Sequence, residues 1–198
     1  MTRSAEFAMA AFQLFSQRGL DAVTMDDIAA SQQATKGSLY WHYKSKDEII
    51  EAACTHYYKV WHKEAQRGIA RINDPIGKIR HIIRTSVHSC LIDEHNRIFT
   101  MEILARSLHD ESTRKGWRGF FDSVRAFYLA LVETAVEDGA LDLDEVEPAV
   151  DAMLSAMEGY KLRAVFEPDL CSRSQEQVIA NQLLGLLNIE GAQPDRTS

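Results

Sequence analysis

Three helix-start signals follow one another closely in the stretch TMDDIAASQQATKGSLYWHYKSKDE, residues 24–48. Thr24, Thr35 and Ser45 are good N-cap residues, and an acid follows Thr24 and Ser45 three positions later, as in a capping box. This spacing leaves room for two very short helices before a longer one begins. Because a helix of about six residues is unstable alone in water, neighbouring segments must hold these two in place.

The two short helices have an apolar inner face. Ile28, Ala29 and Leu39 can be buried against the helix that precedes them. That preceding helix is expected from about Ser4 to Arg18, where apolar residues recur at helical spacing, and Gly19 stops it. The N-terminal segment therefore predicts a small bundle of three helices.

The outer face of the second short helix carries hydrogen-bond donors of different lengths, namely Thr35, Lys36, Ser38 and Tyr40. Gly37 lies among them and removes bulk where another surface must come close, although it costs a helix about 1 kcal/mol relative to Ala. Two short helices joined by a tight turn, the second exposed and donor-rich, indicate a helix-turn-helix. Its second helix would enter the DNA major groove.

The rest of the chain also has helical periodicity, without the alternation that marks strands. Hydrophobic residues make up 45% of the sequence, enough for a good core. We therefore predict an all-α fold of about nine helices, the later six at about 45–72, 75–93, 96–109, 111–138, 146–166 and 174–188.

Charge is distributed unevenly along the chain. The net charge is −7, but residues 1–46 carry five basic and four acidic side chains, a balance of +1. The remainder therefore has −8, and no acid occurs from Lys36 to Lys46. A basic tip on an acidic body suits a protein that touches phosphate at one end only. We expect a DNA-binding domain at 1–46, called the head below, and a second helical domain at 47–198, called the body.

Other classes of protein find little support. The sequence has no nucleophile elbow, phosphate loop or HExxH motif, and Asp142 and Asp144 lie in a loop without apolar surroundings that could shift their pKa values. We therefore do not expect an enzyme. No apolar run is long enough to span a bilayer. The cysteines, Cys54, Cys90 and Cys171, are widely spaced and odd in number, so we expect reduced thiols in a cytoplasmic protein.

Three histidines, His81, His88 and His95, recur every seven residues. Seven residues of helix rise about 10.5 Å, so no two of them can share one metal ion, whose ligand bonds are about 2 Å long. We expect neither a metal site nor a cofactor.

At residues 7–54 the sequence resembles the DNA-binding head of the TetR family of bacterial transcription regulators. The resemblance is carried by AFQLFSQRGLDAV followed by TMDDIAASQQATKGSLYWHYKSKDEIIEA. One departure lies in the turn, where the family usually has Ala-Gly-Val and this chain has Gln32, Gln33 and Ala34.

The resemblance implies a homodimer that binds double-stranded operator DNA and a small-molecule effector. It makes Lys36, Ser38 and Tyr40 candidates for contacts to bases or the groove. Candidates for phosphate contacts are Thr24, Thr35, Tyr40, His42 and Lys46, and Gly37 belongs to the same surface.

The resemblance also implies a ligand pocket in the body and a four-helix interface from the last two helices of each subunit. Candidate pocket residues on the middle helices are Phe99, Glu102, Ile103, Trp117, Phe121, Tyr128 and Met157. Aromatic and Met residues at helical spacing can equally be core, and Glu102 can equally form an ion pair with Arg106. Candidate interface residues are Ala149, Ala152, Met153, Ala156, Ile179, Leu183, Leu186 and Leu187.

The expected function is a ligand-responsive transcriptional regulator, a repressor released from a palindromic operator by a small-molecule effector. The alternative is a helical small-molecule-binding or scaffold protein without operator binding. The altered turn is the feature that supports this alternative.

Overall fold

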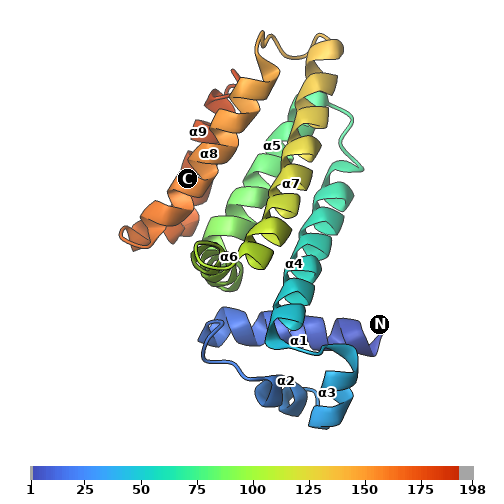
Figure 1. Cartoon of the computed structure of the whole chain (residues 1–198). Helices are drawn as coiled ribbons and strands as arrows, with labels where there is room; N and C mark the ends of the chain where they lie inside the picture. Colours follow the sequence, from blue (N-terminus) through green and yellow to red (C-terminus); the bar gives the residue numbers. More distant parts are fainter. Residues whose placement is uncertain (1, 192–198) are drawn as a thin grey trace. The chain divides into compact units, whose positions relative to one another are not determined.

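The computed structural model describes residues 2–191. Over this range the protein is all-α, with nine α-helices, one π-helical turn and one 3-10 turn (Figure 1). The α-helices are α1 (Arg3–Arg18), α2 (Met25–Ser31), α3 (Lys36–His42), α4 (Lys46–Ile69), α5 (Pro75–Val87), α6 (Glu94–Ser107), α7 (Glu111–Glu137), α8 (Val146–Ala164) and α9 (Arg173–Gly185). The all-α prediction and the predicted number of helices are confirmed.

The chain divides into two compact units. The first contains the chain up to Lys63 together with Glu94–Phe120, and the second contains Glu64–Asp93 together with the chain from Phe121 onward. The head predicted at 1–46 therefore lies wholly within the first unit, which also includes α6 and parts of α4 and α7. The predicted domain boundary after residue 46 concerns function and not compactness, so these units do not test it and it stays a prediction.

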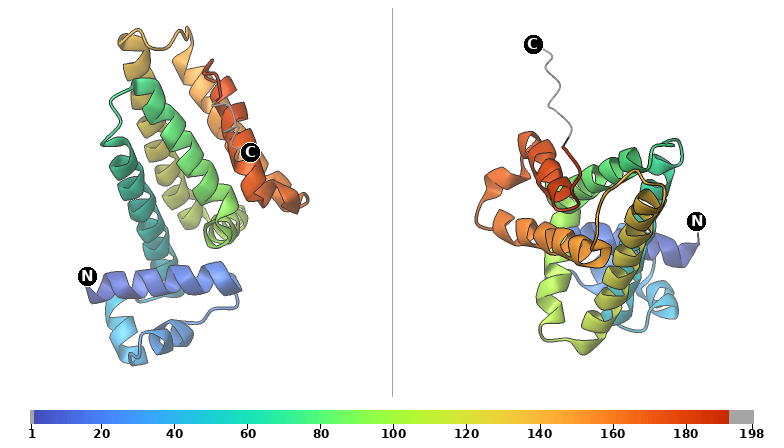
Figure 2. Two further views of the ribbon diagram at one scale, coloured as in Figure 1. Left: turned by 180° about the vertical axis from the view of Figure 1, so that it is seen from behind. Right: turned by 90° about the horizontal axis from the view of Figure 1, so that it is seen from above.

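The core of the first unit forms where α2 and α3 pack on one side of α1 (Figures 1 and 2). Phe7 and Phe15 of α1, Ile28 of α2 and Leu39 of α3 are fully buried. Burying side chains of this size stabilises a fold by about 1.5–3 kcal/mol each, so the two short helices owe their existence to these contacts.

The predicted caps explain where the short helices begin. The Thr24 hydroxyl accepts the Asp27 N–H at 3.1 Å, and the Asp27 carboxylate accepts the Thr24 N–H at 2.8 Å, which completes a capping box. Ser45 accepts the Glu48 N–H at 3.2 Å. The Glu48 carboxylate, however, accepts the N–H of Lys44 and not that of Ser45, so the last cap reaches one residue further back than a standard capping box.

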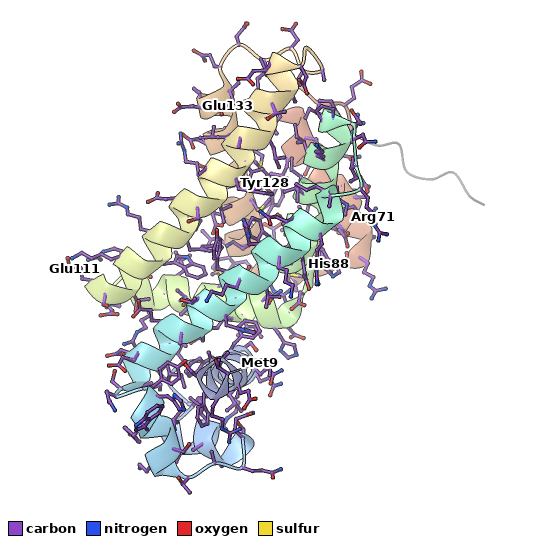
Figure 3. All side chains as sticks on the ribbon, turned by 90° about the vertical axis from the view of Figure 1, so that its right-hand side faces the viewer. Met9, Arg71, His88, Glu111, Tyr128 and Glu133 are labelled. Carbon is purple, nitrogen blue, oxygen red and sulfur yellow. The ribbon has the colours of Figure 1, made fainter. Side chains whose placement is uncertain are left out.

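In the second unit α9 packs against both α5 and α8 (Figure 2). Its interior includes Ile82 and Ile83 of α5 and Tyr128 of α7. The Tyr128 side chain points inward (Figure 3), and its hydroxyl donates to the buried Ser86 hydroxyl at 2.8 Å. Because the tyrosine is fully buried, desolvation raises its pKa.

The continuous helix predicted at 75–93 is interrupted in the structure. After α5 the chain forms a π-helical turn, His88–Ile92, in which the Asp93 N–H donates to the His88 carbonyl. This turn shifts the register between His88 and His95, so the three histidines do not form one regular stripe. His88 instead lies 3.1 Å from the Glu176 carboxylate.

Within residues 2–191, no helix is long and apolar enough to cross a membrane. Across the same range, no group of three or more His, Cys, Asp or Glu side chains is arranged to hold a metal ion. Cys54, Cys90 and Cys171 form no disulfide with one another, and each is half-buried. Burial raises the pKa of Cys54 to about 12, so this thiol is unreactive at neutral pH.

Candidate nucleic-acid interface

Helix α3 presents one open face to the surroundings. Its N-cap, Thr35, accepts the Ser38 N–H at 3.2 Å, which fixes the start of the helix. Leu39 is the only fully buried residue of α3, so it supplies the main core contact of the helix, and the opposite face stays accessible.

Gly37 lies on that open face. A Cβ atom added there would meet only the Thr35 hydroxyl oxygen, at 3.9 Å, so nothing within the chain excludes a side chain. Glycine lowers the stability of a helix, and no contact within the chain requires it at this position. A surface that another molecule approaches closely would explain its presence.

The turn between α2 and α3 closes without a glycine. Gln33 adopts φ +51°, in the left-handed region. Its N–H donates to the Ala30 carbonyl and the Ala34 N–H donates to the Ala29 carbonyl, each at 3.0 Å. These two bonds form a Schellman motif. The altered turn sequence therefore preserves the helix-turn-helix geometry at the cost of placing a side-chain-bearing residue where Gly is favoured.

Lys36 begins α3 and is held by a carboxylate of α2. Its ammonium lies 2.9 Å from each carboxylate oxygen of Asp26, and both side chains are about 60% exposed. The hydrogen bond and charge of Asp26 raise the pKa of Lys36. Lys36 also lies over the Tyr40 ring, 5.8 Å from its centre.

Four of the predicted DNA-contacting residues line one shallow surface groove of about 270 Å³. These are Thr24, Lys36, Tyr40 and Lys46, and the groove also contains Asp21 and Asp26. The Lys46 ammonium reaches the Asp21 carbonyl at 3.4 Å, the outer limit of a hydrogen bond.

The aromatic residues at the end of α3 divide between core and surface. His42 is half-buried and its ring lies 5.7 Å from that of Phe7, so it faces inward more than a phosphate contact requires. Tyr43 is half-buried and its hydroxyl donates to the Ser4 carbonyl at 3.0 Å. Trp41 is 75% exposed, which makes it the most accessible aromatic of the head. Trp41 was not among the predicted contact residues.

Lys44 was also absent from the predicted contacts. Its ammonium donates to the Tyr40 and Trp41 carbonyls at 2.9 and 3.2 Å, which satisfies the free carbonyls at the end of α3. A cation at a helix C-terminus is favoured by the helix dipole, so Lys44 has a structural role in the free protein.

Comparison with known families agrees with this geometry. The family model described as "Bacterial regulatory proteins, tetR family" matches residues 9–53, the segment that contains α2, the turn and α3. The protein belongs to the TetR family of transcriptional regulators. It is thus a helix-turn-helix DNA-binding regulator of a family that is not enzymatic.

The similarity to TetR-family proteins extends beyond the head. The HTH-type transcriptional regulator TtgR of Pseudomonas putida is 28% identical over 177 residues, covering 83% of this chain and 81% of TtgR. The HTH-type transcriptional repressor KstR2 of Mycolicibacterium smegmatis is 26% identical over 145 residues, covering 72% and 70%. The crystal structure of a TetR transcription regulator from Haloarcula marismortui shares the fold, with a TM-score of 0.81 at 14% identity over 93% of this chain and 96% of that one.

The predicted ligand-binding residues are distributed over both units. Phe99, Glu102, Ile103 and Trp117 belong to the first unit, and Phe121, Tyr128 and Met157 belong to the second. All but Glu102 and Phe121 are buried. These placements do not distinguish pocket residues from core residues, so the ligand site stays a prediction.

Glu102 has a partner that the sequence did not predict. Its carboxylate accepts the N–H of Leu20 at 3.0 Å, just after Gly19 ends α1. The ion pair considered between Glu102 and Arg106 does not form, because Arg106 instead lies 2.6 Å from Asp47. Glu102 therefore joins α6 to the loop that follows α1.

Four of the predicted dimer-interface residues, Met153, Ile179, Leu183 and Leu187, lie in the core of the single subunit. Each is at most 1% exposed, so their apolar stripes are covered by the subunit's own helices. These four side chains pack within the subunit, and the predicted interface between subunits stays a prediction. Ala149 and Ala156 are half-buried, whereas Ala152 and Leu186 are exposed.

Proposed function

We propose that this TetR-family regulator is a repressor that binds a palindromic operator as a homodimer and is released by a small-molecule effector. The observation that supports operator binding most directly is the open, donor-rich face of α3, held in place by the Schellman turn and anchored by Leu39. One relative, KstR2, is named as a repressor, which supports the sign of regulation.

Direct readout of the operator would come from α3 in the major groove. Lys36 is suited to guanine O6 and N7, and one good bidentate contact discriminates by about 1–3 kcal/mol. Thr24 and Lys46 lie at the same groove and are suited to phosphate contacts, which position the protein without reading sequence.

A binding experiment with the DNA upstream of the protein's own gene tests operator recognition. Fluorescence anisotropy over a series of salt concentrations should show specific binding with a salt slope that reflects several phosphate contacts. Lys36→Ala should weaken binding to this DNA. Lys115→Ala, which removes an exposed lysine of α7, is the matched control and should bind like the wild type.

The outcome of that experiment separates the two candidate functions. Equal, weak affinity for upstream and random DNA would favour the alternative, a helical ligand-binding protein without an operator. Unchanged affinity and sequence preference in Lys36→Ala, with specific binding intact, would show that the face of α3 is wrongly assigned.

A dimer surface is better sought among the exposed apolar residues of the second unit. Leu162, Val165 and Phe166 near the end of α8 are 54–78% exposed, and Val178 of α9 and Leu186, which follows α9, are also exposed. Because large exposed apolar patches are unusual on a monomer, these side chains are candidates for contact with a second copy of the chain. A second copy of the chain that covered these residues would give the four-helix interface implied by the family.

Sedimentation of a surface variant tests this assignment. Phe166→Asp should dissociate the dimer while leaving the helical circular dichroism unchanged, because the side chain is 78% exposed in the single subunit. Leu183→Asp should instead unfold the chain, because Leu183 is fully buried. A Phe166→Asp protein that sediments as a native dimer would exclude this surface.

Effector release requires that the ligand bind two arrangements of the protein unequally. Helix α4 contributes residues to both units, which makes it the natural element to carry the change. Mass spectrometry of co-purifying small molecules would identify the effector. Calorimetry should then show that operator DNA weakens effector binding by the same factor by which effector weakens DNA binding, and equal effector affinity with and without DNA would refute release by this route.

A further inference from the structure

In the free protein, the lysine best placed to contact DNA is already paired with an anion. The Lys36 ammonium lies 2.9 Å from both oxygens of the Asp26 carboxylate. Both groups line the groove that contains Thr24, Tyr40 and Lys46, so the pair sits within the proposed DNA-binding surface.

The fold does not depend on this pair. Asp26 and Lys36 are each about 60% exposed at the side chain, and ion pairs of such exposure contribute little to stability. The cap at the start of α2 uses the neighbouring Asp27, and the cap of α3 uses Thr35. Leu39 and Ile28, not the ion pair, supply the buried contacts of the two helices.

The pair does change what DNA binding involves. A free lysine that enters the DNA groove neutralises phosphate charge and releases a condensed cation, whether its ammonium contacts a base or a phosphate. This release strengthens binding and makes it depend on salt. A lysine that must first leave a carboxylate exchanges one anion for another. The carboxylate is then left unpaired beside the DNA, where it attracts a cation back.

We propose that Asp26 is a negative determinant of DNA affinity, which acts by competing with DNA for the Lys36 ammonium. This inference rests on the proposed function, since it requires that α3 contact DNA. The bidentate geometry supports it, because both carboxylate oxygens would have to be replaced by DNA acceptors. The raised pKa of Lys36 in the free protein reflects the same attraction.

The deciding variant is Asp26→Asn, which keeps the size of the side chain and removes its charge. Its affinity for the upstream DNA and for random duplex DNA should rise about threefold at moderate salt, the scale of an exposed ion pair. The slope of log affinity against log salt should steepen by about 0.9, the value for one additional phosphate charge neutralised.

Two further variants show whether Asp26 acts through Lys36. Asp21→Asn removes an equal charge from the same groove, and no ion pair of Asp21 with Lys36 is formed. It should raise affinity less than Asp26→Asn does. In a Lys36→Met background, the effect of Asp26→Asn should shrink to that of Asp21→Asn, because the competed lysine is gone.

Each outcome bears on the proposal. An equal effect of Asp26→Asn and Asp21→Asn, or an undiminished effect in the Lys36→Met background, would overturn it and leave only general charge repulsion. Wild-type affinity and slope in Asp26→Asn would also overturn it, provided that circular dichroism shows the helices intact. Failure of the wild type to bind either DNA would instead count against the proposed function.

Discussion

Replacing Gln33 by glycine should stabilise the protein, although the change removes a side chain and loosens the unfolded chain. Gln33 has φ +51°, a conformation that costs an L-residue with a Cβ about 1–2 kcal/mol. Glycine relieves this cost but adds about 0.4–1 kcal/mol of backbone entropy to the unfolded state. The two effects oppose each other, and their difference predicts a net stabilisation of about 0.5–1 kcal/mol.

Chemical unfolding followed by tryptophan fluorescence measures this difference. Trp61 and Trp117 are 5% and 4% exposed, so both report loss of the first unit's core. Gln33→Gly should raise the urea midpoint with an unchanged slope, and raise the melting temperature by about 1–4 °C. Anisotropy with upstream DNA should confirm that the turn still positions α3.

The neighbouring glutamine provides the matched control. Gln32 has φ −103°, where glycine relieves no strain, so Gln32→Gly should destabilise by about 0.5–1 kcal/mol. Gln33→Ala keeps the Cβ and should leave stability near that of the wild type. If Gln33→Gly lost as much stability as Gln32→Gly, the left-handed conformation assigned to this turn would be refuted.

Three other changes test separate parts of the structure. Lys46→Ala should weaken binding evenly across DNA sequences and lower the salt slope by about 0.9, and a sequence-dependent loss would exclude a phosphate role. Glu102→Ala should lower the free energy of unfolding by about 1–3 kcal/mol, because the N–H of the buried Leu20 loses its acceptor. Glu102→Gln keeps an acceptor oxygen, so its free energy of unfolding should fall by less in the same urea titration. Burial raises the pKa of Tyr128 in the folded protein, so above about pH 10 this side chain ionises in the unfolded chain and not in the folded one. The free energy of unfolding should therefore fall as the pH rises above about 10. Tyr128→Phe should show a shallower fall, and equal pH profiles would contradict this assignment.

The helix boundaries were predictable because their signals are local. An N-cap such as Thr24 or Thr35 acts on backbone groups two or three residues away, so the sequence alone contains both partners. The inner positions of α2 and α3 were equally readable, since Ile28 and Leu39 are large aliphatic side chains that the sequence predicted to be buried, and both are fully buried. The DNA-binding head and its resemblance to the TetR family could therefore be identified from the sequence alone.

Features that depend on distant partners were not predictable. Nothing in the residues around Glu102 indicates a backbone N–H 82 positions earlier. An apolar stripe such as that of Leu183 shows that a helix is covered on one side, but the covering surface can belong to the same subunit or to another. The left-handed Gln33 lacked the glycine that usually marks such a turn, and the π-turn after Val87 carries no sequence signal that we recognise.

The bond between Glu102 and the Leu20 N–H limits how this regulator can be recombined with its relatives. A chimera that took only residues 1–46 from this chain would bring the Leu20 N–H and leave its acceptor behind on α6. The recipient would then need a side chain of similar length and polarity at the equivalent place, or the buried amide would be left without a hydrogen bond. Modular exchange of DNA specificity should therefore succeed more often when α6 travels with the head than when the cut follows the helix-turn-helix alone.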